Sequence, residues 1–245
     1  MLKFLVGIFE FPANKLLNLN IMFKNIPAIA VVLTDIDVLS LDEDSLKDAD
    51  LIELRVDMFE SINNIEEVFT IALEKFKLPI ILTVRAPSEG GKREFLNRLT
   101  IYERLINYAD FVDIEILSNE VLPLRKMSKE YGKIMIYSYH RFDLTPSIDE
   151  LEKIFEKAKS LDADIIKIAT MVNYKSDLES LLHFTLNHKN DQIIVIGMGI
   201  KGVPSRVINP VFGSLITYAN ITVTSAPGQI HLKDMVHILK TLGLR

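Results

Sequence analysis

The 245-residue chain contains no cysteine. This absence excludes disulfide bonds, thiolate zinc sites, iron–sulfur clusters and a cysteine nucleophile. The chain also lacks an apolar run of about 20 residues, the length that a membrane-spanning helix needs. It has no basic run, and its net charge of -5 gives it little attraction for a polyphosphate backbone. We therefore expect neither nucleic acid nor membrane as a partner, and the missing cysteine agrees with a cytoplasmic protein.

No linker rich in glycine, proline or serine divides the chain. Short segments rich in Ile and Val alternate with amphipathic segments of helical length from Ala28 onward. The alternation predicts parallel strands joined by helices, and a single-domain (β/α)8 TIM barrel over residues 26–245 fits this length. A doubly wound open sheet is the alternative, because periodicity cannot establish closure. The expected strands are 28–34, 51–56, 80–84, 111–116, 134–139, 165–169, 193–197 and 221–224, and the expected helices include 65–76, 93–108, 148–161 and 178–188.

Residues 1–25 lie outside this alternation. Their first part, MLKFLVGIF, places one lysine before an apolar stretch, as a signal peptide does. However, Glu10 and Pro12 follow at once, and no small-residue cleavage site is visible. We expect an extra N-terminal element under the barrel, or an upstream start codon with the natural start at Met22.

Lys167 stands in the middle of an otherwise apolar expected strand, Asp164-Ile-Ile-Lys-Ile-Ala-Thr170. Because side chains alternate along a strand, Lys167 shares a face with Ile165 and Ala169. Lysine is seldom buried, and burial lowers its pKa, which predicts a free amine able to attack a carbonyl group. The alternatives are a lysine paired with a carboxylate at the barrel rim, or one that reaches out to solvent.

Charged residues also alternate along the second expected strand, which reads Leu51-Ile-Glu53-Leu-Arg55-Val-Asp57. In a barrel this spacing directs Glu53 and Arg55 inward, where they must pair or meet a polar ligand. A purely structural ion pair is the alternative.

Three further candidates follow strands or end them. Arg85 follows the third strand, and Glu89 stands beside two glycines in the next loop, where a solvated turn residue is the commoner case. His140 ends the fifth strand, and its ordinary pKa near neutrality makes it a candidate general acid and base.

The segment Gly197-Met-Gly-Ile-Lys-Gly202 matches the dinucleotide-binding pattern GxGxxG. We reject that function, because one strand–helix unit remains and no acidic residue follows about 20 positions later to bind a ribose. In a barrel loop these glycines leave room for a ligand or an anion. Arg206, directly after this loop, is a candidate to bind a carboxylate or phosphate. The five histidines lack metal-ligand spacing, so we expect no metal.

Taken together and in order, these motifs resemble type I 3-dehydroquinate dehydratase from about Ala28 to the C-terminus. The motifs are Glu53-Leu-Arg55-Val-Asp57, Thr83-Val-Arg85 with Glu89-Gly-Gly91, Ser138-Tyr-His140, Lys167-Ile-Ala169, Gly199…Gly202…Ser205-Arg206, Phe212-Gly-Ser214 and Ser225-Ala-Pro-Gly-Gln229.

The resemblance implies a Schiff-base barrel enzyme without metal or cofactor, often a homodimer, that converts 3-dehydroquinate to 3-dehydroshikimate in the shikimate pathway. It implies that Lys167 forms the imine, that His140 transfers the protons and that Glu89 orients His140. It also implies that Arg206 binds the substrate carboxylate, under a final loop that closes as a lid. The side chains expected to hold the substrate hydroxyls are Glu53, Arg55, Arg85, Ser225 and Gln229.

Two other functions fit parts of the pattern. A sugar-phosphate aldolase would use the same lysine, although Glu53 and Glu89 would repel a dianionic phosphate. The second alternative is a ligand-binding barrel that has lost catalytic activity, since a fold alone never proves activity.

Overall fold

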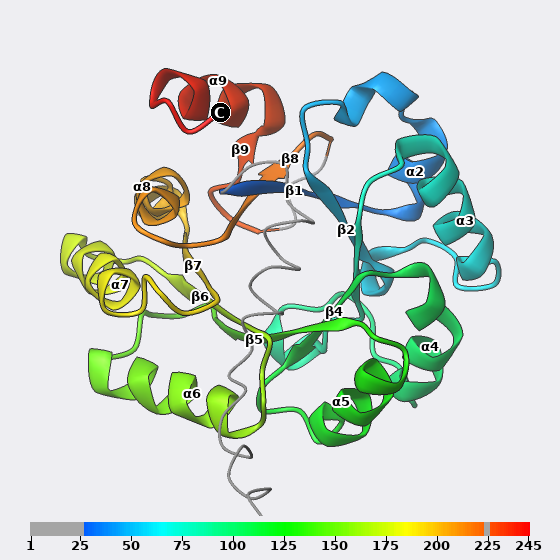
Figure 1. The fold of residues 1–245 in the computed structure, drawn as a ribbon, viewed down its shortest axis with the longest axis horizontal. Coiled ribbons are helices and arrows are strands. Elements are labelled where there is room, and N and C mark those ends of the chain that lie inside the picture. Colours follow the sequence, from blue (N-terminus) through cyan, green and yellow to red (C-terminus); the bar gives the residue numbers. More distant parts are fainter. Residues whose placement is uncertain (1–26, 223–225) are drawn as a thin grey trace, which may run out of the picture.

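The computed structural model describes residues 27–222 and 226–245, and these form a barrel of parallel strands surrounded by helices (Figure 1). The expectations for residues 1–25 lie outside the described residues. The strands are β1 (Ala28–Leu33), β2 (Leu51–Arg55), β3 (Ile80–Thr83), β4 (Phe111–Glu115), β5 (Ile134–Arg141), β6 (Ile165–Met171), β7 (Ile193–Met198), β8 (Ile216–Asn220) and the two-residue β9 (Ile230–His231).

The strands pair in the order β7-β6-β5-β4-β3-β2-β1-β8-β9, and every pair is parallel. Directly before β8, the backbone N–H of Leu215 donates to the carbonyl of Ile193 in β7 over 2.8 Å. This bond joins the start of β8 to β7 and so closes the ring formed by β1 to β8. The prediction of a single-domain (β/α)8 barrel is therefore confirmed, and the doubly wound open sheet is excluded.

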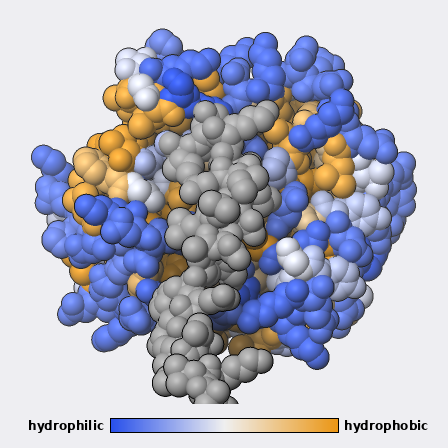
Figure 2. All heavy atoms as spheres, viewed as in Figure 1, coloured by the Kyte–Doolittle hydropathy of each residue, from blue (hydrophilic) through white to orange (hydrophobic). Residues whose placement is uncertain are grey.

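Helices connect the strands and cover the outside of the barrel (Figure 1). Seen from the same side, they present mostly hydrophilic side chains to solvent (Figure 2). None of the helices in the described parts of the chain combines the length and the apolarity that crossing a bilayer requires. The helices are α2 (Asp35–Ser40), α3 (Ile65–Phe76), α4 (Arg98–Leu105), α5 (Val121–Glu130), α6 (Ile148–Ser160), α7 (Lys175–Asn187), α8 (Ser205–Val211) and α9 (Leu232–Thr241).

Most predicted bounds differ from the structure by three residues or fewer, and two elements differ by more. The helix expected over 93–108 begins only at Arg98, because the Asn97 side chain accepts the N–H of Thr100 and caps the helix there. The eighth strand expected over 221–224 is wrong where the structure describes it: Ile221 and Thr222 follow β8. Residues 216–220 and 221–224 have similar β-forming composition, and pairing with β1 selects the first of them.

Inside the barrel, an apolar layer lies below a polar one. Alternate residues of the strands face inward, so the residue two positions after an inward apolar side chain also faces inward. The lower layer is buried and apolar at Leu51, Phe111, Ile136 and Ile165. Two positions further along each strand stand Glu53, Asp113, Ser138 and Lys167, all buried. The change from apolar to polar residues thus places charge toward the carboxyl ends of the strands, where barrel enzymes carry their sites.

Candidate active site

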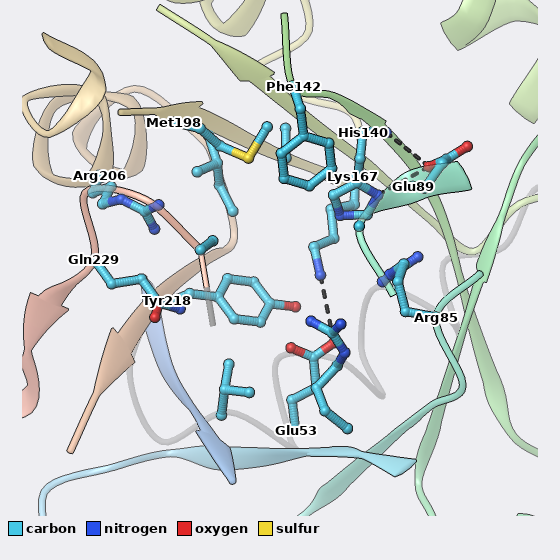
Figure 3. Close-up of a pocket in the computed structure, with 16 residues that line it drawn as sticks. Glu53, Arg85, Glu89, His140, Phe142, Lys167, Met198, Arg206, Tyr218 and Gln229 are labelled. Carbon is cyan, nitrogen blue, oxygen red and sulfur yellow. Dashed lines mark hydrogen bonds and ion pairs between the residues drawn. The ribbon is translucent and has the colours of Figure 1, made fainter. Parts of the chain in front are cut away.

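One cavity lies at the carboxyl ends of the strands (Figure 3). It brings together all the predicted site residues that the structure describes. Ser225, the remaining candidate, lies outside the described residues. The candidates that line the cavity are Glu53, Arg55, Arg85, Glu89, His140, Lys167, Arg206 and Gln229.

Lys167 extends from β6 into this cavity, and its side chain is 5% exposed. Its Nζ lies 3.1 Å from Asp113 Oδ2 and 3.6 Å from Glu53 Oε1. Burial lowers the pKa of Lys167, but the negative charges of Asp113 and Glu53 outweigh burial and raise this pKa above its ordinary value. The prediction of an amine deprotonated by burial is therefore wrong. Lys167 pairs with carboxylates, as one alternative supposed, but it does so buried in the cavity and not at the barrel rim.

Asp113 joins Lys167 to a buried network formed by residues of β4, of β5 and of the segment after β3. Its Oδ1 accepts hydrogen bonds from Arg85 over 2.8 Å and from Ser138 over 2.6 Å. Arg85 also reaches Glu115 Oε1 over 3.3 Å. Burial alone would raise the pKa of Asp113, but the cations Arg85 and Lys167 hold it well below its usual range. Asp113 is consequently an anion that holds the lysine amine in place.

Arg55 and Glu53 do not pair with each other, although both line the cavity. Arg55 makes a two-point contact with Asp57, with Nε and Nη2 each 2.8 Å from a carboxylate oxygen. Glu53 accepts the hydroxyl of Thr83 over 2.7 Å. Glu53 and Arg55 therefore each have a partner within the chain, which agrees with the alternative of a structural role. Both side chains still face the cavity.

His140 lies at the end of β5 against the carboxylate of Glu89. Its Nδ1 is 3.0 Å from Glu89 Oε2, and its backbone N–H donates to the same oxygen over 2.9 Å. Burial lowers the pKa of His140 well below its ordinary value, and the cations Arg85 and Lys167 lower it further. Burial raises the pKa of Glu89 to about 7, although Arg85 opposes the shift. The contact favours a neutral ring with its proton on Nδ1, which leaves a lone pair on Nε2.

The loop that carries Glu89 is packed onto the end of β5 and is not a solvated turn. The Phe142 ring stacks on the His140 ring with an interplanar angle of 17° and 6.4 Å between centroids. Gly90 has φ +85, and a Cβ there would lie 2.4 Å from Phe142 Cζ. Glycine is therefore required at position 90, both for its backbone conformation and for the close approach of Phe142.

Arg206, in α8, is buried at the opposite side of the cavity from Glu89 (Figure 3). Its Nη2 donates to the carbonyl of Pro227 over 3.2 Å. Among the described residues, its Nε has no hydrogen-bond partner and no carboxylate pairs with the guanidinium. Burial lowers the pKa of Arg206 to about 10. Because an unpaired buried cation is costly, this arrangement favours a bound anion.

The glycine-rich loop after β7 has a different role from the predicted one. A Cβ on Gly202 would lie 2.4 Å from the carbonyl carbon of Gly197, so these glycines allow two backbone segments to touch. Gly199 donates its N–H to the carbonyl of Pro227 over 3.1 Å. None of these three glycines lines the cavity. These glycines pack the loop after β7 against the loop that contains Pro227. Their role is therefore structural, and they do not provide space for an anion.

Several cavity or network residues were not predicted from the sequence. Asp113 and Glu115 occupy alternate positions of β4, the same pattern that revealed Glu53 and Arg55, so the signal was present. Phe142 and Tyr218 are aromatic residues beside expected strands, and nothing in the sequence separates them from ordinary core residues. No group of three or more candidate metal ligands occurs in the described ranges.

Comparison with known proteins is consistent with this geometry. The 3-dehydroquinate dehydratase of Thermodesulfovibrio yellowstonii is 59% identical over 224 residues, which cover 91% of this chain and 99% of that protein. The crystal structure of 3-dehydroquinate dehydratase from Aquifex aeolicus has a TM-score of 0.78 at 37% identity, covering 87% of this chain and 98% of that one. A structure of the type I enzyme from Clostridium difficile with covalently modified comenic acid has a TM-score of 0.79 at 29% identity, covering 89% and 93%.

The family model of type I 3-dehydroquinase matches residues 28–245, nearly all of the chain. The match, the similar relatives and the barrel with its buried lysine agree. This chain therefore belongs to the type I 3-dehydroquinase family.

Proposed function

We propose that this protein is a 3-dehydroquinate dehydratase, a lyase that removes water from 3-dehydroquinate in the third step of the shikimate pathway. The main support for the proposal is that the buried amine of Lys167 lies in the same cavity as the neutral imidazole of His140. Family membership supplies the substrate, because the side chains alone specify a ketone and an anion but no particular molecule.

In the proposed reaction, Lys167 forms a Schiff base with the C3 ketone. The ammonium first loses a proton, and the neutral His140 in the same cavity is a base that can accept it. The free amine then attacks the carbonyl carbon. The ketone oxygen takes one proton from the amine and the proton that His140 holds, and it departs as water, which leaves a protonated imine and a neutral His140. The resulting iminium withdraws electrons and acidifies the hydrogens on the neighbouring carbon, C2.

His140 then takes a C2 proton through Nε2 and later gives a proton to the C1 hydroxyl, which leaves as water in a syn elimination. Glu89 supports this role, because its carboxylate holds Nδ1 and leaves Nε2 directed away from it. Water hydrolyses the imine, releases 3-dehydroshikimate and restores Lys167.

Arg206 is proposed to bind the substrate carboxylate, since it is buried without an anionic partner among the described residues. Glu53, Arg55 and Gln229 line the same cavity and are proposed to hold the hydroxyls. Arg85 is proposed to act with them, although three of its contacts are already made to Asp113, Glu115 and Ser138. Ser225 stays a proposal from the family resemblance, as do the lid-like closure, the homodimer and the cytoplasmic location.

Reductive trapping tests the reaction class and the residue together. Borohydride added with substrate or product should reduce the imine and leave a covalent adduct that maps by mass spectrometry to a peptide containing Lys167. The Lys167→Ala variant should lose both the adduct and the conjugated enone product, which is followed by its ultraviolet absorption.

Lys201 provides the matched control, because its amine bonds the carbonyl of Asn173 on the surface and does not line the cavity. Lys201→Ala should keep both the adduct and the rate. An adduct on Lys201 in the wild-type protein, or a wild-type protein that converts no 3-dehydroquinate, would refute the proposed function.

A further inference from the structure

Tyr218 is a buried phenol that the proposed reaction leaves without a role. It belongs to β8, where it pairs in register with Ala30 of β1, and its side chain points into the barrel. The residue is 3% exposed and lines the cavity. Its hydroxyl has no hydrogen-bond partner among the described residues. A buried hydroxyl left unpaired costs free energy, so its presence beside a ligand cavity points to a ligand that satisfies it.

Lys167 lies beside this hydroxyl without making a hydrogen bond of regular geometry to it. The Lys167 amine lies over the face of the Tyr218 ring, 4.2 Å from the centroid, in a cation–π contact. Figure 3 shows the ring lying across the cavity, with its hydroxyl end directed toward Lys167 and its other end toward Gln229. The phenol oxygen is thus held next to the amine that attacks the ketone.

The polar groups nearest the amine already have partners. Asp113 accepts hydrogen bonds from Arg85, Ser138 and Lys167. Glu53 accepts one from Thr83. Tyr218 is different, because its oxygen alone in this set has no partner in the described parts of the chain.

The phenol is also suited to donate. Burial raises the pKa of Tyr218, and the carboxylates of Glu53 and Asp113 raise it further, against the opposing effect of Lys167. The hydroxyl therefore keeps its proton at neutral pH and can donate it to a neutral oxygen.

We propose that Tyr218 is a substrate-binding residue, whose hydroxyl donates a hydrogen bond to an oxygen substituent of the substrate ring beside the carbon that Lys167 attacks. This inference rests on the proposed function. In this proposal the hydroxyl helps to bind and align a substrate ring that carries oxygen groups next to its ketone. The hydroxyl has no role in folding of the chain.

The test compares Tyr218→Phe with the wild type. Removing the hydroxyl should lower kcat/KM about 10-fold, because this is the size of effect expected for one neutral hydrogen bond in a buried site. The variant should be as thermally stable as the wild type or more so, because the lost hydroxyl has no partner in the described fold. Borohydride trapping should still label Lys167.

Tyr137→Phe is the matched control. The hydroxyl of Tyr137 donates to the carbonyl of Leu161 over 3.1 Å on the outer side of the barrel wall, away from the cavity. This variant should lose thermal stability and keep the wild-type kcat/KM. The pair separates a ligand contact from a folding contact.

A Tyr218→Phe protein whose kcat/KM stays within about twofold of the wild type would overturn the inference while leaving the proposed function intact. A variant that loses thermal stability as Tyr137→Phe does, with unchanged kcat/KM, would overturn it as well. A wild-type protein without dehydratase activity would remove the proposed function and this inference together.

Discussion

Glu89 is a buried carboxylate whose pKa is raised by burial to about 7, close to physiological pH. Above that pH it is an anion that accepts the Nδ1–H of His140, and below it the carboxyl group is neutral. If the anion orients the imidazole, kcat/KM should fall as the pH drops through about 7, because this ratio reports groups of the free enzyme. A pH profile of kcat/KM measures this directly.

Glu89→Gln is the matching variant, because an amide keeps the shape and an acceptor oxygen but does not titrate in this range. Its profile should lose the fall near pH 7. A fall that persists in Glu89→Gln would assign that titration to another group and would contradict the role of Glu89.

Arg98, in α4, connects that helix to the barrel wall through hydrogen bonds. Its guanidinium bonds Glu115 of β4, Glu120 at the start of α5 and the carbonyl of Val84. The side chains of Arg98 and Glu115 are 10% and 3% exposed. Because Glu115 also contacts Arg85 of the cavity network, the pair joins the outer helices to the site.

Arg98→Ala should lower the free energy of unfolding by about 3–5 kcal/mol, because it leaves buried carboxylate charge without one of its cations. Arg104 of the same helix supplies the comparison, since its pair with Glu66 is 43% and 35% exposed. Arg104→Ala should cost under about 1 kcal/mol. Urea unfolding of the two variants gives both values, and equal losses would contradict the structural role of Arg98.

At the scale of the whole molecule, Arg245 connects the last residue of the chain to the first strands. Its Nη2 lies 2.7 Å from Asp50 Oδ1, and its Nη1 donates to the carbonyl of Asp48 over 2.6 Å. Asp50 in turn accepts the backbone N–H of Ile29 in β1 over 2.8 Å. The contact therefore joins residues 195 positions apart in the sequence and holds α9 near the start of the barrel.

Arg245→Ala should destabilise the fold by about 1.5–3 kcal/mol, the range for hydrogen bonds to charged groups. Its melting temperature should fall while kcat/KM at low temperature stays that of the wild type, because Arg245 lies away from the cavity. Lys240→Ala removes an exposed contact to Asp48 at 4.0 Å and should change stability little. A melting temperature for Arg245→Ala equal to that of Lys240→Ala would contradict this role.

The sequence by itself determined the alternation of strands and helices and the edge of the sheet where the site lies, whereas closure of the barrel was established only by the structure. Period-two patterns are local, so they show which face Lys167 shares with Ile165 and Ala169 and which residues follow each strand. The helical period of 3.6 residues is equally local, and it placed α3 over Ile65–Phe76 as the structure has it. The local patterns failed at β8, because two adjacent segments had similar composition and only pairing with β1 distinguishes them.

Only the tertiary structure decided the charges inside the cavity. Lys167 lies 54 residues from Asp113, and Glu89 lies 51 residues from His140, so no local pattern records either contact. A pKa depends on every charge within several ångströms and on the depth of burial, and both depend on where distant segments meet. Alternation along the strand could therefore predict a buried lysine. The folded barrel was needed to show that two carboxylates hold this lysine as an ammonium, beside a phenol that has no hydrogen-bond partner among the described residues.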